Sequence, residues 1–551
     1  MEMSSYLQMD ARDNVVVALK DLKKGEVVHV NGGAILLLDD IPAKHKFFTT
    51  DLRSGEAVIM YGTLVGRAQQ DVAGGKWLNA SNVKHDAGSF EYKGYRYEWK
   101  PPDVGPFVGR TFMGYHREDG RVGTANYWLF IPTVFCENRN LDVIREVLDD
   151  ELGYAVTDKY KRFAHDLVRA YRNGIDLDHV DMAGALAPGG QNGPGRLFEN
   201  VDGIRFLIHQ GGCGGTRQDA ETLGDLLAAY ADHPNVGGVT LLSLGCQHLQ
   251  IDHFKKALSR RNASFQKPFL IFEQQKIGDE ETLIRQAILK TFQGLTAINK
   301  FRRQPAPISK LCIGVKCGGS DGFSGISANP AVGYTADLLV ASGGQVLLAE
   351  FPELCGAEQE LLNRCTEEST AHKFIRLMKS YNALAIQAGS GFHMNPSPGN
   401  IRDGLITDAM KSAGAVKKGG TSPVVDVLDY TEKVTKDGLS LVCTPGNDVE
   451  STTGKVASGA NLILFTTGLG TPTGNPICPT IKISSNTRIA KKMHDTIDID
   501  AGAVITGEKS IEQMGSIILD LCIKVASGEV IPKTVLLRQD DFIPWKRGVS
   551  L

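Results

Sequence analysis

One stretch of the sequence holds an unusual density of groups that could do chemistry. Residues 316–330 read KCGGSDGFSGISANP, and an apolar run at residues 311–315 leads into them. A surface turn needs one or two glycines for positive φ, whereas this stretch has four glycines among lysine, cysteine, serine, aspartate and asparagine. Such a composition predicts a backbone that closes around a polyoxygenated or anionic ligand. The alternative is a long glycine-rich loop that binds nothing.

The chemistry that these residue types suit is the removal of water from a hydroxylated acid. Taking a proton from the carbon next to a carboxylate requires a base, and the enediolate charge that forms requires a cation. Lys316 can neutralise the carboxylate or act as the base, and Asp321 can take a hydroxyl proton or hold a metal. The side chains of this stretch that can hydrogen-bond substrate hydroxyls are Ser320, Ser324 and Asn329.

Further polar loops in the C-terminal part of the chain are predicted to form other walls of the same pocket. They are punctuated by glycine and follow or flank apolar runs such as residues 462–465. Each of them could also be an ordinary turn. Their candidate substrate-binding residues are Asn395, Ser397, Asn400, Asn447, Asp448 and Thr471.

Motifs for several other chemistries are missing from the sequence. There is no GxxxxGK[ST] and no GxGxxG between a strand and a helix, which argues against a nucleotide site. HExxH and zinc-finger spacing are also missing, which argues against a zinc protease and a zinc finger.

The composition excludes several classes of protein. A net charge of −3, with 42% hydrophobic and 22% charged residues, predicts a soluble globular protein that binds neither nucleic acid nor a membrane. The polar N-terminus carries no signal peptide, and no apolar run is long enough to span a bilayer. The ten cysteines include no CxxC pair, so we expect a reducing cytoplasm as the compartment. We further expect a homo-oligomer.

Four apolar strands are predicted to place cysteines at the edge of a sheet. The strands cover residues 127–135, 206–208, 239–244 and 311–315, and the cysteines that follow them are Cys136, Cys213, Cys246 and Cys317. Helical patterns at 141–152 and 218–231 lie between the strands, which indicates a mostly parallel α/β sheet. Because ligands bind at the carboxyl ends of such strands, we expect these cysteines, His209 and Lys316 to gather on one rim. The alternative is that each cysteine is a small buried hydrophobic residue.

The chain divides into four predicted segments. Residues 1–85 are a small β domain with recurring glycine turns, in which His45, between two lysines, is the one chemically distinctive residue. Residues 86–106, rich in glycine, proline, tyrosine and charge, form a linker. Residues 107–303 form an α/β domain with an inserted helix and an exposed loop near 155–200. Residues 304–551 form a C-terminal α/β catalytic domain.

Several motifs together resemble the altronate and galactarate dehydratases, enzymes that remove water from aldonic or aldaric acids. They are KCGGSDGFSGISANP at 316–330, AEFPELCGAEQ at 349–359, NPSPGN at 395–400, PGND at 445–448 and FTTGLGTPTG at 465–474. The resemblance continues in HQGGCGG at 209–215 and SLGCQHLQ at 243–250. LDDIPAKHKFFTTDL at 38–52 resembles the small SAF domain of the family, including its histidine.

The resemblance implies an N-terminal SAF domain of the β-clip type, a large α/β region of two subdomains, and a requirement for Fe²⁺ or Mn²⁺. The candidate catalytic residues are then His45, His209, Lys316 and Asp321, and the candidate metal ligands are His45, Cys213, Cys246 and Cys317. Within the family the altronate dehydratases are the most similar, so the expected reaction converts D-altronate to 2-keto-3-deoxy-D-gluconate and water. Galactarate or sulfolactate could be the substrate instead.

Two other hypotheses use the same residues. Cys136, Cys213, Cys246 and Cys317 could bind an iron–sulfur cluster. The chain could also bind a sugar acid without turning it over. Ala125 and Gln247 stand where the family usually has arginine and glutamate, which leaves room for reduced activity.

Overall fold

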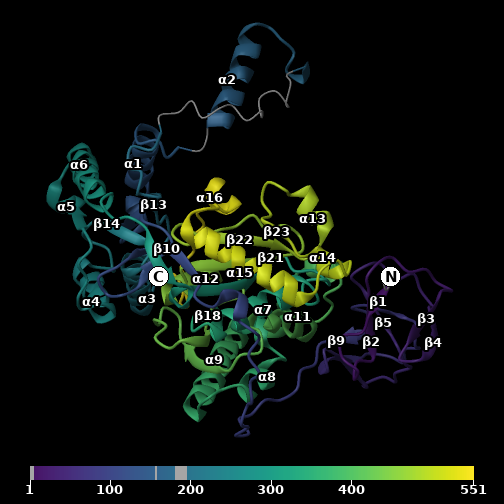
Figure 1. Ribbon diagram of the computed structural model, residues 1–551. Coiled ribbons are helices and arrows are strands. Elements are labelled where there is room, and N and C mark those ends of the chain that lie inside the picture. Colours follow the sequence, from purple (N-terminus) through teal and green to yellow (C-terminus); the bar gives the residue numbers. More distant parts are fainter. Residues whose placement is uncertain (1–4, 156–157, 180–194) are drawn as a thin grey trace. The chain divides into compact units, whose positions relative to one another are not determined.

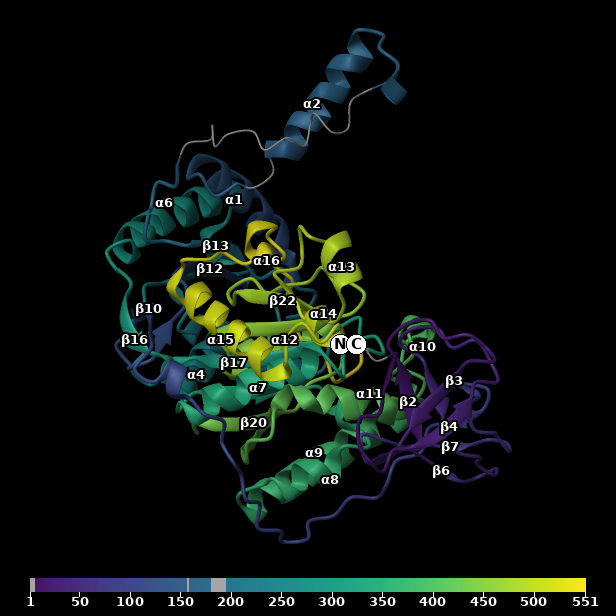
Figure 2. The same cartoon turned by 45° about the vertical axis from the view of Figure 1, so that its right-hand side comes forward.

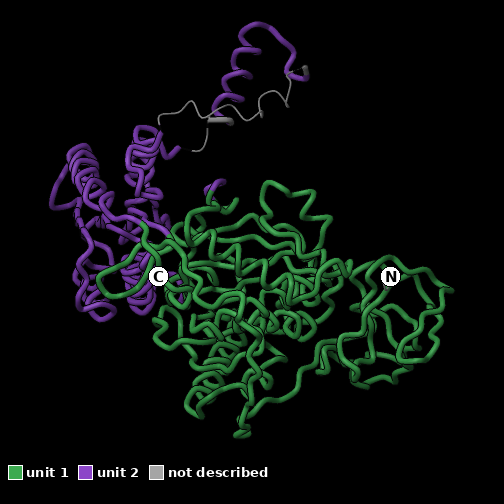
Figure 3. Tube along the Cα trace, in the orientation of Figure 1, with its two compact units in different colours: residues 1–124, 303–535, 539–547 green, residues 125–302, 536–538, 548–551 purple. Residues whose placement is uncertain are grey.

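The computed structural model describes residues 5–155, 158–179 and 195–551, which form two compact units (Figures 1 and 3). Unit 1 joins residues 1–124, 303–535 and 539–547. Unit 2 joins residues 125–302, 536–538 and 548–551. Most of the loop predicted within the 155–200 insertion lies outside the described residues. No helix in the described ranges is long and apolar enough to cross a membrane.

The N-terminal part of unit 1 is a small β domain, as predicted. Its turns contain Gly25, Gly55 and Gly75, which have φ values of +88°, +86° and +81°, a region that suits glycine because it lacks a Cβ. Apolar side chains of alternate strands, such as Phe48 and Val58, are buried between the small sheets. The strands are β1 Tyr6–Leu7, β2 Val15–Ala18, β5 Lys46–Phe48 and β8 Trp77–Leu78 in one sheet, β3 Val27–Val30 and β4 Gly33–Leu36 in a second, and β6 Ala57–Met60, β7 Thr63–Ala68 and β9 Val83–Lys84 in a third.

The centre of unit 1 is a seven-stranded parallel sheet. Its middle strands are apolar runs buried on both faces, which is the pattern of a parallel sheet covered by helices. The strands in spatial order are β19 Val424–Leu428, β20 Gly438–Val442, β18 Gln345–Leu348, β17 Cys312–Cys317, β21 Leu462–Thr467, β22 Thr480–Ser484 and β23 Ile499–Asp500. A separate antiparallel sheet contains β11 Val122–Gly123, β10 Thr111–His116 and β16 Gln304–Pro307.

The order of the strands creates a switch point between β17 and β21. The chain builds outward from β17 through β18 and β20, then returns to pair β21 with the other side of β17. The helix α7 lies in the connection from β17 to β18, and α12 lies in the connection from β20 back to β21. Because right-handed crossovers that run in opposite directions pass over opposite faces of a sheet, α7 and α12 lie on opposite faces. In both views α7 lies beside α15, and the two helices are in contact (Figures 1 and 2). Ligands bind at such a switch point in open α/β sheets.

The helices of unit 1 cover this sheet and carry the loops at its carboxyl edge. They are α7 Ala328–Ala341, α8 Glu358–Asn363, α9 Glu368–Gln387, α10 Pro398–Arg402, α11 Asp408–Ala415, α12 Asp448–Ser458, α13 Thr487–Lys492, α14 Gly502–Ile505 and α15 Ile511–Ser527, with α16 Lys533–Leu536 leading into unit 2. Two 3₁₀ helices, η6 Phe351–Leu354 and η8 Val416–Gly419, also carry site residues.

Unit 2 contains a four-stranded parallel sheet with the order β13-β12-β14-β15. The side chain of Thr216 caps the start of α3 by accepting a hydrogen bond from the Asp219 N–H, and α3 ends two residues before Pro234, as its pattern predicts. The insertion contributes the helix α2, as predicted. The elements are β12 Tyr127–Pro132, β13 Gly203–Phe206, β14 Val236–Ser243 and β15 Phe269–Glu273, with α1 Asn138–Glu151, α2 Asp158–Arg172, α3 Arg217–Asp232, α4 Ile251–Arg261, α5 Gln274–Ile277 and α6 Glu280–Ile298.

The prediction of a single rim with four cysteines is wrong. β12, β13 and β14 are neighbours in the sheet of unit 2, whereas β17, which ends at Cys317, is central in the sheet of unit 1. The apolar pattern of a buried parallel strand identifies the strand but not its neighbours, because every such strand has the same pattern. Cys136, Cys213 and Cys246 therefore share one edge, and Cys317 belongs to another.

Candidate active site

A polar cavity of about 450 Å³ lies at the carboxyl edge of the seven-stranded sheet. Its walls are the loops that follow β17, β18, β20 and β21, together with α10, α11 and the segment before α10. This is the position that the switch point of the sheet predicts. Six of the predicted site residues line it, namely Ser320, Asn395, Ser397, Asn400, Asn447 and Asp448.

Three of these residues hold the walls in place by capping helices. Ser397 and Asn400 form a capping box at the start of α10, and the Asn400 Nδ2 also donates to the Ser320 carbonyl at 2.8 Å. Asn447 caps α12 by accepting hydrogen bonds from two backbone N–H groups. The Ser320 Oγ differs from them, because it is buried, lies on the cavity and has no hydrogen-bond partner. A substrate hydroxyl or carboxylate would satisfy it.

The glycines after β17 let the backbone come close to the other walls. A Cβ at Gly318 would collide with the Asp448 carboxylate, and a Cβ at Gly319 would lie 2.6 Å from the Thr471 Oγ1. Gly319 also has a φ of +57°. Thr471 does not line the cavity itself, and its contribution is this close contact with the loop. The glycine-rich loop is therefore required by packing as well as by backbone conformation.

Lys316 is fully buried at the end of β17 and is held by three acceptors. Its ammonium group pairs with Glu350, lies 2.9 Å from the Asp448 Oδ1 and donates to the Gly446 carbonyl at 3.1 Å. Glu350 has a left-handed backbone with a φ of +73°, a strained conformation for a residue other than glycine. Such strain is concentrated at functional sites. Lys316 thus links the buried Glu350 to Asp448 on the cavity wall.

Two more lysines complete a network of buried charges. The Lys418 Nζ lies 2.9 Å from the Glu350 Oε2 and 2.7 Å from the Cys317 Sγ. The Lys411 Nζ lies 2.9 Å from the Glu353 Oε1. Burial raises the pKa of Glu353, but the neighbouring ammonium groups outweigh it and lower that pKa overall. Burial likewise lowers the pKa of Lys411, and Glu353 outweighs it and raises that pKa. Glu353 and Lys411 are therefore an ion pair on the cavity wall.

The same network offers donor atoms for a metal ion. Atoms of Cys317, Glu350 and Glu353 lie within 4.8 Å of one another. Two carboxylates and a thiolate suit Fe²⁺ or Mn²⁺ better than Mg²⁺, which prefers an all-oxygen site. The ammonium groups of Lys316 and Lys418 already face these donors, so the position stabilises positive charge. Glu350, Glu353, Lys411 and Lys418 were missed by the sequence analysis, although the first two lie in the quoted AEFPELCGAEQ motif.

Asp321 is fully buried and its carboxylate is saturated with donors. Its Oδ1 accepts from the Ser324 Oγ at 2.9 Å and the Ser485 Oγ at 2.8 Å. Its Oδ2 accepts from the Asn486 Nδ2 at 3.0 Å and pairs with the Lys44 Nζ at 3.1 Å. In this arrangement Asp321 and Ser324 shape the loop and do not line the cavity.

Asn329 is also used within the fold. Its Nδ2 donates to the Gly414 carbonyl at 3.0 Å, and its Oδ1 accepts from the Thr466 Oγ1 at 2.6 Å. Asn329 is buried at the start of α7 and does not line the cavity. The polar side chains of the stretch therefore divide into one that faces the cavity, Ser320, and several that fix the loop around it.

His45 lies where the β domain meets the rest of unit 1. Its Nδ1 accepts a hydrogen bond from the indole N–H of Trp77 at 3.2 Å, so Nε2 carries the proton and donates to the Arg402 carbonyl at 3.0 Å. With both ring nitrogens engaged, the ring has no free lone pair for a metal. The flanking lysines, whose roles the sequence analysis did not assign, make the charged contacts. Lys44 pairs with Asp321, and Lys46 donates to the Gly404 carbonyl at 2.6 Å.

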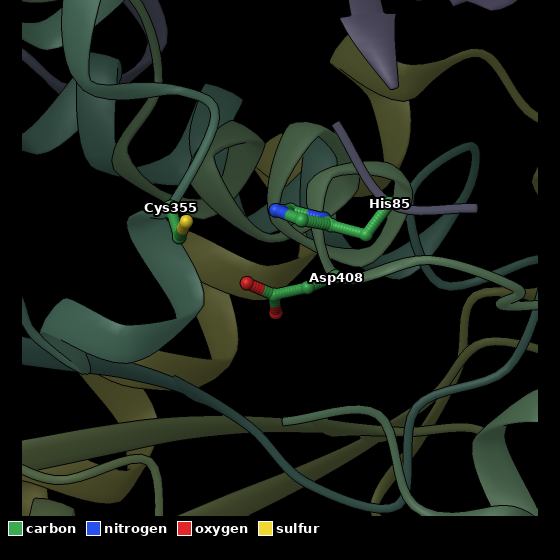
Figure 4. A group of neighbouring side chains, drawn as sticks. All are labelled: His85, Cys355 and Asp408. Carbon is green, nitrogen blue, oxygen red and sulfur yellow. The ribbon is translucent and has the colours of Figure 1, made fainter. Parts of the chain in front are cut away.

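A second group of candidate metal ligands in unit 1 is His85, Cys355 and Asp408, whose donor atoms face one another (Figure 4). Asp408 is fully buried, and neither of its oxygens has a hydrogen-bond partner of good geometry. Burial raises the pKa of Asp408 well above its usual range, and the nearby Lys411 lowers it. The His85 Nδ1 accepts from the Ala409 N–H at 3.3 Å, so Nε2 is protonated.

His209 lies in unit 2 and is buried. Its Nδ1 accepts from the Gly211 N–H at 3.1 Å, and its Nε2 lies 2.9 Å from the Pro132 carbonyl. Burial lowers the pKa of His209 to about 4, so the ring is neutral. The ring joins the loop after β13 to the end of β12. Cys213 and Cys246 are exposed at the same edge of the sheet, together with Cys136.

Comparison with known proteins gives the family of the chain. Residues 4–86 match the altronate/galactarate dehydratase SAF domain, and residues 114–299 match the second domain of D-galactarate dehydratase/altronate hydrolase. Residues 308–550 match the C-terminal D-galactarate/altronate dehydratase domain. The altronate dehydratase of Bacillus subtilis (strain 168) is 34% identical over 532 residues, 96% of each chain.

The chain belongs to the altronate/galactarate dehydratase family. The altronate dehydratase of Escherichia coli (strain K12) is 33% identical over 549 residues, 99% of this chain and 100% of the relative. The galactarate dehydratase (L-threo-forming) of the same organism is 29% identical over 533 residues, 95% of this chain and 93% of the relative. The predicted resemblance is confirmed, and membership of this family makes the chain a hydro-lyase.

Proposed function

We propose that the chain dehydrates D-altronate to 2-keto-3-deoxy-D-gluconate and water. The observation that supports a sugar acid is the cavity itself, where amide and hydroxyl groups surround a Glu353–Lys411 ion pair and the unpartnered Ser320 Oγ. Similarity to two proteins named altronate dehydratase over nearly the full length supports altronate as the acid. Galactarate is the second candidate, because the galactarate dehydratase is similar over nearly the same length.

The reaction removes a proton from C2 and a hydroxide from C3, and the enol that remains gains a proton at C3 to give the 2-keto acid. Asp448 is the cavity carboxylate with a partly exposed side chain, 28% accessible, and we assign it as the base for the C2 proton. Lys316 does not line the cavity, and its ammonium group, 2.9 Å from the Asp448 Oδ1, would position that carboxylate and stabilise its negative charge. Lys411 is the ammonium group on the wall that can bind the substrate carboxylate or protonate the departing hydroxide.

Fe²⁺ or Mn²⁺ is the proposed cofactor. Cys317, Glu350 and Glu353 would hold it, since their donor atoms lie within 4.8 Å of one another. When bound there, the ion supplies a Lewis acid for the enediolate oxygens. The protein groups around it position the substrate, and Ser320 and Lys411 would bind its hydroxyl and carboxylate groups.

The experiment is a panel of sugar acids assayed for 2-keto-3-deoxy products, with and without added Fe²⁺. We expect altronate to be turned over fastest and Asp448→Asn to abolish both turnover and exchange of the C2 hydrogen with deuterium. Fast turnover of galactarate and not altronate would overturn the substrate. Tight binding of altronate without turnover in fully metallated protein would indicate a sugar-acid-binding protein instead.

A further inference from the structure

The exposed cysteines of the chain are gathered at one place. Among its ten cysteines, Cys136, Cys213 and Cys246 are exposed, and the other seven are buried or half-buried. These three follow β12, β13 and β14, which are adjacent strands of the parallel sheet in unit 2. A free cysteine is among the most buried residue types in proteins. Three exposed thiols at the ends of three neighbouring strands therefore require an explanation other than packing.

The loops that carry the three cysteines are bonded to one another. The Phe135 N–H donates to the Gly211 carbonyl at 3.1 Å, and the Leu249 N–H donates to the Gly212 carbonyl at 3.2 Å. Gly212 has a φ of +97°, and a Cβ there would collide with the backbone at Thr133. The Cys213 loop is thus fixed between the other two. The three loops follow neighbouring strands of one parallel sheet, so the three thiols belong to the same edge of that sheet.

The spacing of the sulfurs decides what they can hold. In the described residues, two sets of potential ligand atoms lie within 4.8 Å of one another, and neither set contains these three thiols. At least one pair of the three sulfurs is therefore farther apart than 4.8 Å. Two thiolates on one zinc ion, each about 2.3 Å from it, can be at most about 4.6 Å apart. A single ion therefore does not reach all three sulfurs without movement of the loops. A cluster of several iron atoms, each bound by one cysteine, spans a wider triangle.

We propose that Cys136, Cys213 and Cys246 bind a [4Fe–4S] cluster at the carboxyl edge of the unit 2 sheet. Each thiol releases its proton to solvent as its sulfur binds one iron atom. Two ferrous ions, two ferric ions and four sulfide ions are supplied from outside the protein, so the 2+ cluster forms without a further oxidant. Because the protein gives three thiolates, the fourth iron keeps a position open to water or to an oxygen ligand. An iron atom with an open position can act as a Lewis acid. The site is independent of the Cys317 group, which lies in the other unit.

The test uses the full chain purified without oxygen and, in parallel, reconstituted with ferrous iron, ferric iron and sulfide. We expect a brown protein with visible absorption and about four sulfide per chain, with about four iron per chain beyond any ferrous ion held by the Cys317 group. Cys136→Ser, Cys213→Ser and Cys246→Ser should each lose most of the colour and sulfide. The matched control is Cys317→Ser, which should keep both, with circular dichroism and gel filtration used to confirm folding of every variant.

A second measurement does not depend on variants that fold. In the wild-type holoprotein, Cys136, Cys213 and Cys246 should resist alkylation, and all three should be labelled after the cluster is removed with a chelator and an oxidant. Colourless protein after reconstitution, iron bound without sulfide, or equal loss of colour in Cys317→Ser would overturn the cluster. Because these readouts are spectroscopic and analytical, they stand or fall separately from turnover of altronate.

Discussion

Replacing Lys316 with methionine is the sharpest test of the charge network. The substitution keeps the length of a side chain that is fully buried but removes its ammonium group from Glu350 and Asp448. Breaking a buried ion pair by removing one partner costs about 3–5 kcal/mol, because a buried charge is left without its partner. Glu350 keeps Lys418 at 2.9 Å, and the Asp448 side chain is 28% exposed. We therefore expect a loss at the lower end, about 3 kcal/mol.

The effect on catalysis should exceed the effect on stability. Lys316 positions the proposed base Asp448, which lies 2.9 Å away. Loss of a positioned acid–base group costs about 10²–10⁴ in rate, so Lys316→Met should lower turnover by at least about a hundredfold. The double variant Lys316→Met/Glu350→Gln also leaves the buried Lys418 ammonium group without its carboxylate partner. It should lose further stability and recover none of the lost turnover.

The assay combines urea unfolding, followed by fluorescence, with steady-state turnover of altronate under conditions where each variant is folded. The matched control is Lys436→Met, since Lys436 is 44% exposed and lies 3.9 Å from Glu367, an exposed pair worth about 0–1 kcal/mol. A Lys316→Met protein with wild-type stability and turnover within tenfold of the wild type would refute the reasoning. So would a double variant that regains turnover.

Three further predictions follow from the site. Chelation should abolish turnover, and added Fe²⁺ or Mn²⁺ should restore it. The Cys317→Ser variant should need a higher metal concentration to regain half of its turnover. Full turnover in metal-free protein would contradict this prediction. His45→Ala should lower turnover by at least about a hundredfold if the ring acts in catalysis, and a loss of stability with normal turnover would instead show that it serves to join Trp77 to Arg402. His209, whose folded-state pKa is lowered to about 4 from about 6.5, should contribute stability that is complete above pH 6.5 and declines by about 3 kcal/mol as pH falls to 4. The difference in unfolding free energy between wild type and His209→Gln, measured across that range, should show this slope.

The fold was predictable where each strand or turn carries its own signal. The glycine turns of the β domain and the buried runs that became β17, β14 and β21 have local patterns, and the structure confirms them. The arrangement of strands into two sheets was not predictable, because a strand that is apolar on both faces does not encode its neighbour. The ends of β12 and β13 were also placed too late. Both strands stop at Pro132 and Phe206, where the chain leaves the sheet before its cysteine.

The residues of the candidate site were also predictable only in part. Ser320, Asn395 and Asp448 could be found from the sequence because they lie in polar loops that follow apolar strands. Lys411 and Lys418 could not be found from the sequence, because each lies in a helical segment whose sequence is typical of an exposed helical turn. Tertiary packing, and not local pattern, buries them beside Glu353 and Glu350.

The charges of the buried lysine–carboxylate network give a reason to expect a metal ion in the site. Three ammonium groups, those of Lys316, Lys411 and Lys418, face the carboxylates of Glu350, Glu353 and Asp448 and the thiol of Cys317. Burial lowers the pKa of the nearby Lys482 to about 7 and lowers the pKa of Lys455 well below its usual range, so burial disfavours the charged form of both side chains. The network is therefore close to neutral before a ligand enters. A sugar acid adds one negative charge, and the enediolate adds a second. In a buried site that charge must be balanced, and a divalent cation on Cys317, Glu350 and Glu353 would balance it while lysine alone would not.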